Sequence, residues 1–310
     1  MEGIRTNMVP LCASLLQHAV LNLLTGSFLL LPVFIAGLLL SLLFSSTYNG
    51  YDYSNLRLTG AHRVGYKSFY SKKFRNDVSV FYPAAEDGSG TRDVKFFSDG
   101  LKNIQGLGDA AHLVNANLRY VFDIVYRALL LTIVPVDRDA TLGVKKMQPV
   151  FFSHGALNSK MCYSSHAMEL ASLGFCVFTM THNDGSSEYS PTVGLPDFSK
   201  PTHDYQTRNE WLQIRSREVE ALVREMFEAG RLKEFGADWA QASFAGKLIL
   251  MGHSFGGMTM FTSASKLLNL DPYVIVLDPW MFPMHKDESF RLPESVKAVA
   301  ILTEGHAREL

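Results

Sequence analysis

The segment Gly252-His253-Ser254-Phe255-Gly256-Gly257 constrains the fold more than any other part of the chain. The apolar run Lys247–Met251 leads into it, and the helix-like stretch Met258–Leu270 leads out of it. A Gly-x-Ser-x-Gly sequence between a buried strand and a helix is typical of a nucleophile elbow, where a serine sits at the tip of a tight, strained turn. Side chains two residues before or after the serine would collide with the neighbouring strand and helix, which explains the glycines. The segment therefore predicts a nucleophilic Ser254, and a glycine-rich turn without chemistry is the alternative.

Short apolar runs alternate with helix-like stretches through the rest of the chain. Such an alternation favours parallel strands joined by crossover helices, and runs that are apolar throughout indicate strands buried on both faces. The sequence therefore predicts an α/β fold with an open, mostly parallel sheet flanked by helices. Strands are expected at Asp77–Tyr82, Val150–Phe152, Phe175–Thr181, Tyr273–Leu277 and Ala298–Leu302, helices within Leu101–Leu131 and at Met161–Leu173 and Asn209–Phe227, and a long loop at Gly185–Thr207.

A serine nucleophile needs hydrogen-bond donors for the oxyanion that forms on the attacked carbonyl. The helix after Ser254 would point its N-terminus at that oxyanion, and the amide of Phe255 is one predicted donor. The second donor is expected from an early strand-to-helix loop, where Phe152-Ser153-His154-Gly155-Ala156 continues an apolar strand. The glycine in this run lets the backbone approach, so the Ala156 amide is the candidate. We interpret His154 as a side chain that braces the loop.

The acid of such a site follows the serine in chain order. Asp278 comes directly after the apolar run Tyr273–Leu277, and strand ends line the site in open α/β sheets. Its role would be to orient a histidine and to stabilise the cation that this histidine becomes. Asp271 and Asp287 are alternatives on loops. The alternative for Asp278 itself is an aspartate that caps the next turn.

Together these segments resemble the platelet-activating-factor acetylhydrolases of the plasma and intracellular type II group. The resemblance rests mainly on the elbow and on Leu277-Asp278-Pro279-Trp280-Met281-Phe282-Pro283, which is a highly specific match. The similarity runs from about Arg63 to the C-terminus. Further agreement lies in Phe152-Ser153-His154-Gly155, in Leu170-Ala171-Ser172-Leu173-Gly174-Phe175 with His182 shortly after it, and in Arg208-Asn209.

The resemblance implies an α/β-hydrolase fold and a calcium-independent serine esterase that removes short or oxidised sn-2 acyl chains from phospholipids. It implies that Ser254 is the nucleophile, Asp278 the acid, and Ala156 and Phe255 the oxyanion donors. The segment Trp280-Met281-Phe282 would either form an apolar wall beside the acid or simply pack in the core. No metal or other cofactor is expected, because the sequence has no acidic loop with the spacing of a calcium site.

The catalytic histidine is the one member of this site that the sequence does not identify. It should follow a further strand after Asp278, and only His285 and His306 come later in the chain than Asp278. His285 lies in the same turn region, which is too early. His306 follows Ala298–Leu302, but it falls where the family still connects strand to helix, and His253 precedes the nucleophile. We therefore expect a shortened version of a longer chain, or a protein that has lost its base.

The N-terminal fifty residues differ from the rest of the chain in charge. Thr6–Tyr51 contains no charged side chain, and Glu2 and Arg5 carry the only charges of residues 1–51, although the chain has 29 basic and 30 acidic side chains. A membrane span takes about 17–25 apolar residues, and Gly26–Ser45 meets this length. A single transmembrane segment is expected there, preceded by an interfacial helix. A hairpin that spans twice, with its turn at Thr25-Gly26-Ser27, and a buried apolar hairpin are the alternatives.

Residues 1–50 are therefore predicted to form a hydrophobic membrane segment and residues 51–310 a hydrolase domain that is incomplete at its C-terminus. One basic side chain precedes the span, and three follow it closely, Arg57, Arg63 and Lys67. This difference favours a membrane protein with its body on the cytosolic side.

The charge balance also narrows the partners. The net charge is −1 and no long basic run is present, so nucleic acid is not an expected partner. Two of the three cysteines lie in the body, which is too few for a disulfide framework. The leading function is a membrane-tethered phospholipid acyl-ester hydrolase with a phospholipid substrate. The alternatives are a general short-chain carboxylesterase and a catalytically dead fold kept at the membrane for lipid binding.

Overall fold

The structure is a computed structural model that describes residue 53 and residues 56–112, 130, 132–196, 204–284 and 291–307. The membrane span predicted at Gly26–Ser45 lies outside these residues. Among the helices formed by the described residues, none combines the length and the apolar character that a bilayer crossing requires.

The chain divides into two compact units. One unit consists of Met1–Leu56 and Lys95–Ile133. Its described part contains helix α3 (Leu101–His112) and a short antiparallel bridge between Lys95 and Ile133. The other unit consists of Arg57–Val94 and Val134–Leu310 and contains every strand named below. All described candidate site residues belong to this second unit.

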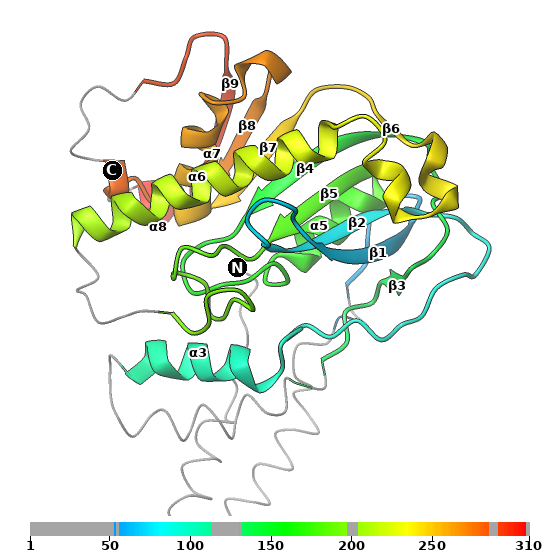
Figure 1. Ribbon diagram of the computed structural model, residues 1–310, viewed down its shortest axis with the longest axis horizontal. Helices are drawn as coiled ribbons and strands as arrows, with labels where there is room; N and C mark the ends of the chain where they lie inside the picture. The colour runs from blue at the N-terminus through cyan, green and yellow to red at the C-terminus, as the bar shows by residue number, and fades with distance from the viewer. Residues whose placement is uncertain are drawn as a thin grey trace, which may run out of the picture. The chain divides into compact units, whose positions relative to one another are not determined.

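The second unit is built on one mixed, mostly parallel sheet (Figure 1). Its strand order is β3-β1-β2-β5-β4-β7-β8-β9, and β6 pairs with β4 beside this path. Neighbours from β5 to β9 run parallel, whereas β1 and β2 form an antiparallel pair and β2 is also antiparallel to β5. The strands are β1 (Arg63–Tyr70), β2 (Asp77–Ala84), β3 (Asp137–Arg138), β4 (Lys146–Ser153), β5 (Phe175–Met180), β6 (Ser243–Phe244), β7 (Ile249–His253), β8 (Tyr273–Leu277) and β9 (Lys297–Ile301).

Helices cover both faces of this sheet. The long helix α6 (Tyr205–Phe227) crosses one face together with α7 (Phe255–Ala264), and α5 (Ser164–Ser172) lies behind the strands in Figure 1. The remaining helical segments are α8 (Glu304–Ala307) and the short 3-10 helices η4 (Leu232–Phe235), η5 (Ala237–Gln241), η6 (Leu268–Leu270) and η7 (Phe282–Met284). The fold is therefore a sheet between helical layers, as the alternation in the sequence predicts.

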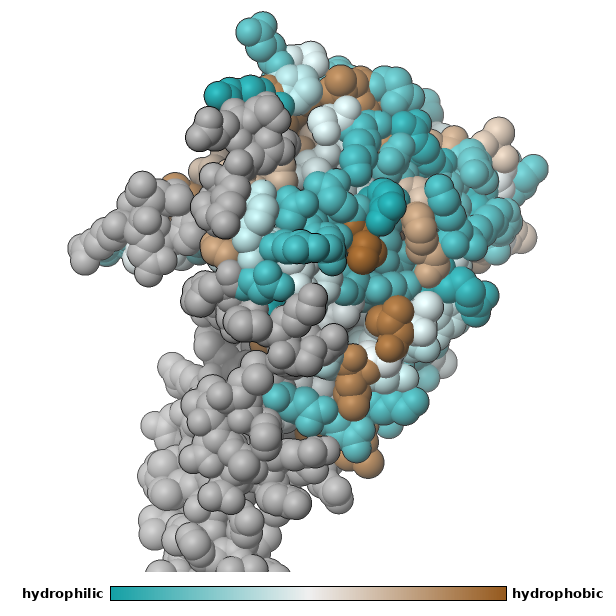
Figure 2. All heavy atoms as spheres, turned by 60° about the vertical axis from the view of Figure 1, so that its left-hand side comes forward, coloured by the Kyte–Doolittle hydropathy of each residue, from teal (hydrophilic) through white to brown (hydrophobic). Residues whose placement is uncertain are grey.

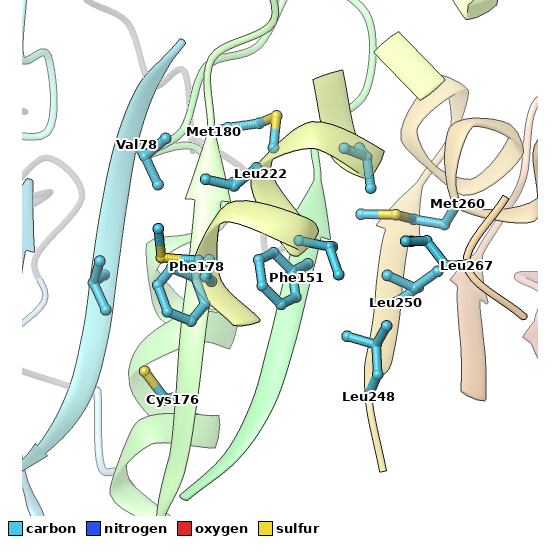
Figure 3. Close-up of a cluster of buried hydrophobic side chains, with 14 of the residues drawn as sticks. Val78, Phe151, Cys176, Phe178, Met180, Leu222, Leu248, Leu250, Met260 and Leu267 are labelled. Atoms are coloured by element: carbon cyan, nitrogen blue, oxygen red, sulfur yellow. The ribbon is translucent and has the colours of Figure 1, made fainter. Parts of the chain in front are cut away.

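The main core fills the space between the sheet and α6 with α7 (Figure 3). Phe151 from β4 and Phe178 from β5 stack with ring centres 4.8 Å apart, and Leu222 of α6 packs in the same cluster. Burying a side chain of this size stabilises the fold by about 1.5–3 kcal/mol. On the surface drawn in Figure 2, hydrophobic residues lie in small groups among hydrophilic ones. The burial pattern thus separates an apolar interior from a mixed surface.

The bounds of several elements differ from those predicted. Strand β2 continues through Pro83 instead of ending before it, because β1 pairs with it as far as Ala84. The missing amide of Pro83 costs no hydrogen bond to β5, whose pairing covers only Val78–Phe81. Helix α7 begins at Phe255, three residues earlier than predicted, since it starts directly after the elbow. Strand β1 was not predicted at all. The part of Leu101–Leu131 beyond α3 lies mostly outside the described residues.

Candidate active site

Ser254 forms the sharp turn between β7 and α7. Its backbone has φ 54° and ψ −121°, a conformation that costs a non-glycine residue energy and that clusters at functional sites. Two backbone hydrogen bonds join Ser254 to the end of β8 and to the loop that follows it. The Ser254 amide donates to the carbonyl oxygen of Leu277 at 2.9 Å, and the Trp280 amide donates to the carbonyl oxygen of Ser254 at 2.9 Å. The structure thus confirms the strained elbow that the sequence predicts.

The glycines on either side of Ser254 are required by close backbone contacts. A Cβ atom on Gly252 would lie 2.3 Å from the carbonyl oxygen of Gly256, and a Cβ atom on Gly256 would lie 2.0 Å from the carbonyl oxygen of Ser153. Real Cβ atoms essentially never approach other heavy atoms this closely. The close approach of β4, β7 and α7 at this point therefore depends on the two glycines.

Asp278 lies beside the elbow at the end of β8. His253 and Leu277 are paired across the two parallel strands β7 and β8. The residues that follow them, Ser254 and Asp278, therefore lie side by side at the carboxyl ends of these strands. The Asp278 amide donates to the carbonyl oxygen of Ile301 at 3.0 Å, and its Oδ1 accepts a hydrogen bond from the Thr303 amide at 2.6 Å. Both Ser254 and Asp278 are half-buried, which is compatible with access from solvent.

Of the two alternative acids, the structure describes only Asp271. Asp271 comes before β8, at the opposite end of the strand, and forms an ion pair with Lys247. Asp287 lies outside the described residues. Asp278 is therefore the acid that the fold brings to the strand end next to Ser254.

The two predicted oxyanion donors come shortly after the ends of two neighbouring strands, β4 and β7. Phe255 is the first residue of α7, and amides in the first turn of a helix have no acceptor inside the helix. Ala156 is exposed and belongs to the loop that continues β4. Gly155 in this loop packs against the elbow, since a Cβ atom there would lie 3.4 Å from His253 Nδ1. The roles of Ala156 and Phe255 as donors stay predictions.

Each histidine near the elbow either has hydrogen-bond partners elsewhere or is not described. His253 Nδ1 is hydrogen-bonded to the Tyr163 hydroxyl at 2.6 Å. His285 lies outside the described residues, and nothing is described of the side chain of His306, although its backbone belongs to α8. No base is thus identified among the side chains that the structure describes.

His154 braces the loop after β4, in agreement with its interpretation from sequence. Its Nδ1 lies 2.6 Å from the carbonyl oxygen of Gly155, and its Nε2 accepts a hydrogen bond from the His182 amide at 3.3 Å. Burial, followed by the positive charge of Arg215 and by His182, holds the pKa of His154 well below its ordinary value. His154 is therefore neutral and acts as a structural hydrogen-bonding side chain.

Beneath this loop lies a buried polar chain that sequence reasoning did not predict. Ser153 Oγ is hydrogen-bonded to His182 Nε2 at 2.8 Å, and His182 Nδ1 to Glu218 Oε2 at 2.7 Å. The order of groups is that of a catalytic triad, but none of the three residues is more than 1% exposed, so no substrate reaches Ser153. Burial lowers the pKa of His182 well below its ordinary value, and burial together with Asp184 raises the pKa of Glu218 to about 8. These hydrogen bonds connect α6 to the end of β4 through His182.

Arg215 and Glu218 could have been found in the sequence by their spacing. Both lie on the face of α6 that carries Leu212, Val219 and Leu222, and all five are buried. Charged residues on the apolar face of a predicted helix are rarely buried unless they are paired. Their positions were therefore a signal for a buried polar site.

The segment after Asp278 both packs in the core and reaches the surface. The Trp280 ring contacts the Phe255 ring edge-to-face, with centres 5.5 Å apart, and stacks on Phe282 at 5.4 Å. Met281 is 37% exposed. The residues that the structure describes include no cluster of three histidine, cysteine or acidic side chains that could hold a metal ion.

Comparison with known proteins gives a family match for most of the chain. The model of the family "Platelet-activating factor acetylhydrolase, isoform II" matches residues 52–236 and 239–299. A platelet-activating factor acetylhydrolase of Bos taurus is 27% identical over 184 residues, which are 52% of this chain and 41% of that protein. One of Gallus gallus is 24% identical over 243 residues, which are 68% of this chain and 56% of that protein. The chain spans about half the length of these relatives.

Among solved structures, a ferulic acid esterase from Streptomyces cinnamoneus has a similar fold. The TM-score is 0.50 at 12% sequence identity, and the match covers 79% of this chain and 74% of that chain. At this identity the similarity concerns the fold alone. It agrees with the mostly parallel sheet flanked by helices that the chain forms.

Proposed function

Because the chain belongs to the family of platelet-activating factor acetylhydrolase, isoform II, we propose that it is a serine esterase. Its proposed substrates are phospholipids with an acetyl or a short or oxidised acyl group at sn-2, such as platelet-activating factor. The observation that carries this proposal is the strained elbow of Ser254 beside Asp278 at one edge of the sheet. This pair has the chain order and the strand-end positions of an α/β-hydrolase nucleophile and acid.

The proposed reaction assigns one task to each group. Ser254 Oγ attacks the ester carbonyl, and the Phe255 and Ala156 amides stabilise the negative oxygen that develops. A histidine that follows Asp278 in the chain takes the serine proton and later returns it to the leaving alcohol. The Asp278 carboxylate orients that histidine. His285 and His306 are the two histidines of this sequence that follow Asp278.

The test compares the chain with two matched serine variants. Ser254→Ala removes the proposed nucleophile, and Ser265→Ala removes an exposed hydroxyl at the end of the same helix, which donates only to a carbonyl of that helix. The substrates are a 2-acetyl phospholipid, its long-chain counterpart and an aryl acetate. We expect Ser254→Ala to lower kcat for the 2-acetyl phospholipid by about 10⁴–10⁶-fold and Ser265→Ala to leave it unchanged.

The other outcomes separate the alternatives. Equal hydrolysis by the protein and its Ser254→Ala variant would remove Ser254 from the reaction. Hydrolysis of the aryl acetate without preference for the 2-acetyl phospholipid would support a general carboxylesterase. A folded protein that neither hydrolyses any of the three nor reacts with a fluorophosphonate at Ser254 would support a catalytically dead lipid-binding fold.

We further propose that Gly26–Ser45 holds the protein in a membrane, with the body on the cytosolic side. The support comes from the sequence, which has no charge from Thr6 to Tyr51. The full chain should stay in the membrane fraction after an alkaline carbonate wash, and a shortened protein that begins at Tyr51 should not. Release of the full chain by the wash would exclude a spanning helix.

A further inference from the structure

The side chain of Arg215 joins the two backbone segments that carry the proposed oxyanion donors. Its Nη1 donates a hydrogen bond to the carbonyl oxygen of His154 at 2.7 Å, and its guanidinium carbon lies 4.3 Å from the centre of the Phe255 ring. Arg215 itself has no exposed surface. We propose that Arg215 is a positioning residue that holds the loop after β4 and the start of α7 together, so that both donors face the oxygen formed at Ser254. This inference rests on the proposed function.

The backbone on both sides of Ala156 is anchored to the Arg215 cluster. The His154 carbonyl, held by Arg215, belongs to the peptide group directly before the one that presents the Ala156 amide. On the other side, the Leu157 amide donates to the carbonyl oxygen of Ser186 at 2.7 Å. The hydroxyl of Ser186 in turn accepts a hydrogen bond from Arg215 Nη2. The peptide that presents the Ala156 amide is thus fixed between two points that share one partner.

On the helix side, Arg215 contacts the residue directly after the nucleophile. A guanidinium over the face of an aromatic ring is attracted to it, and the attraction is stronger where water is excluded. Phe255 is fully buried, and its ring contacts both Arg215 and, edge-to-face, Trp280. Arg215 is therefore one of two side chains that hold this ring, and with it the first turn of α7.

The charge of Arg215 is neutralised within the cluster. Its Nε donates to Asp184 Oδ2 at 2.7 Å, and neither side chain has any exposed surface. The contribution of Arg215 is accordingly geometric. A planar guanidinium offers five donors in a fixed fork, whereas a lysine offers one compact ammonium group. Lysine could pair with Asp184, but it could not hold Asp184, Ser186 and the His154 carbonyl at once.

The matched test is Arg215→Lys against Arg217→Lys. Arg217 lies two residues away on the same helix. It is exposed and does not belong to the buried face of α6. For the 2-acetyl phospholipid we expect Arg215→Lys to lower kcat by about 100-fold, the size of effect caused by a displacement of about 1 Å at a reacting centre. KM should change less than twofold, because the oxyanion forms only in the transition state. Arg217→Lys should change neither value.

A second readout separates positioning from a loss of folding. A trifluoromethyl ketone that forms a tetrahedral adduct with the serine places its oxyanion between the same donors. Its inhibition constant should rise in Arg215→Lys by the factor by which kcat falls. An unchanged kcat, or a fall in kcat with an unchanged inhibition constant for the ketone, would overturn the proposal, as would equal effects in Arg217→Lys.

The inference can fail or hold independently of the activity. In a protein without esterase activity, amide hydrogen exchange still tests it. We expect Arg215→Lys to accelerate exchange in peptides covering residues 154–158 and 255–258, and Arg217→Lys to leave both unchanged. Unchanged exchange in Arg215→Lys would overturn the positioning role, whereas accelerated exchange in an inactive protein would count against the proposed function only.

Discussion

Replacing Gly256 by alanine tests the packing that the elbow depends on. The added Cβ would lie 2.0 Å from the carbonyl oxygen of Ser153, 2.5 Å from its carbonyl carbon and 2.7 Å from the carbonyl oxygen of His154. All three atoms belong to the backbone at the end of β4, so no side chain can rotate out of the way. Gly256 itself lies in the first turn of α7. Either the helix or the strand end has to move.

The size of the required shift sets the expected cost. Ordinary contacts begin at 3.4 Å, so the Cβ and the Ser153 oxygen would have to separate by about 1.4 Å, and forcing extra methyl groups into a packed core costs about 1–3 kcal/mol. We expect Gly256→Ala to lie at the upper end, at about 3 kcal/mol of unfolding free energy. For a domain of this size that corresponds to a decrease in Tm of roughly 6–12 °C.

The same shift should also slow the reaction. The displaced Ser153 and His154 carbonyls precede the loop that presents the Ala156 amide, and a displacement of about 1 Å at a reacting centre costs about 100-fold in rate. The assay is urea unfolding together with kcat for a 2-acetyl phospholipid. Gly305→Ala is the control, because a Cβ there meets nothing within 4 Å. Equal unfolding free energy and kcat in Gly256→Ala and Gly305→Ala would refute the packing argument.

Three further predictions concern charge and metal. Burial raises the pKa of Glu218 from 4.5 to about 8. Between roughly pH 4.5 and 8 the folded chain therefore keeps a proton on Glu218 that the unfolded chain has lost. Because of this proton, Glu218 makes the unfolding free energy fall as pH rises through that range. The unfolding free energy of Glu218→Gln, followed by urea titration from pH 5 to 8, should therefore rise more steeply with pH than that of the unmodified chain; parallel curves would contradict this. Asp278→Asn still offers an oxygen to the Thr303 amide, so Tm should change little while kcat falls by about 10⁴-fold; an undiminished kcat would exclude Asp278 as the acid. Chelation by EGTA should leave hydrolysis unchanged, and a loss of activity that added calcium restores would contradict the backbone oxyanion site.

The parts of the site that the sequence predicts are those with local causes. Gly252 is needed within one turn, because a Cβ atom there would meet the carbonyl of Gly256. The same short Gly-x-Ser-x-Gly pattern also contains Gly256, although the contact that requires this second glycine is with the distant end of β4. Asp278 follows an apolar run without interruption, and a residue at the end of a parallel strand lies at the edge where such sites form. The positions of both residues follow from the pattern of one short segment each. The bounds of β8, Tyr273–Leu277, also agree with the prediction, because the run is apolar throughout.

Other features depend on segments that meet only in the folded chain. Strand β1 (Arg63–Tyr70) is half polar and owes its conformation to its pairing with β2 and to the short parallel pairing with β3. Strand β2 continues through Pro83 because β1 pairs with it as far as Ala84, while β5 ends its pairing at Phe81. Neither pairing is visible in the strand's own residues, so the sequence alone could not predict them.

The buried ionisable side chains of α6 do more than fill the core. A helix that only packed against a sheet would carry apolar residues along its whole buried face. Here Leu212, Val219 and Leu222 do so, whereas Arg215 and Glu218 occupy the same face beside the ends of β4 and β5. Leaving the Arg215 charge unpaired there would destabilise the protein by several kcal/mol, and Asp184 pairs with it. Glu218 likewise has a hydrogen-bond partner on another segment, His182. Buried polar side chains with partners on other segments depart from the apolar pattern of a helix that only packs. Such departures are expected where a fold holds a functional loop in place.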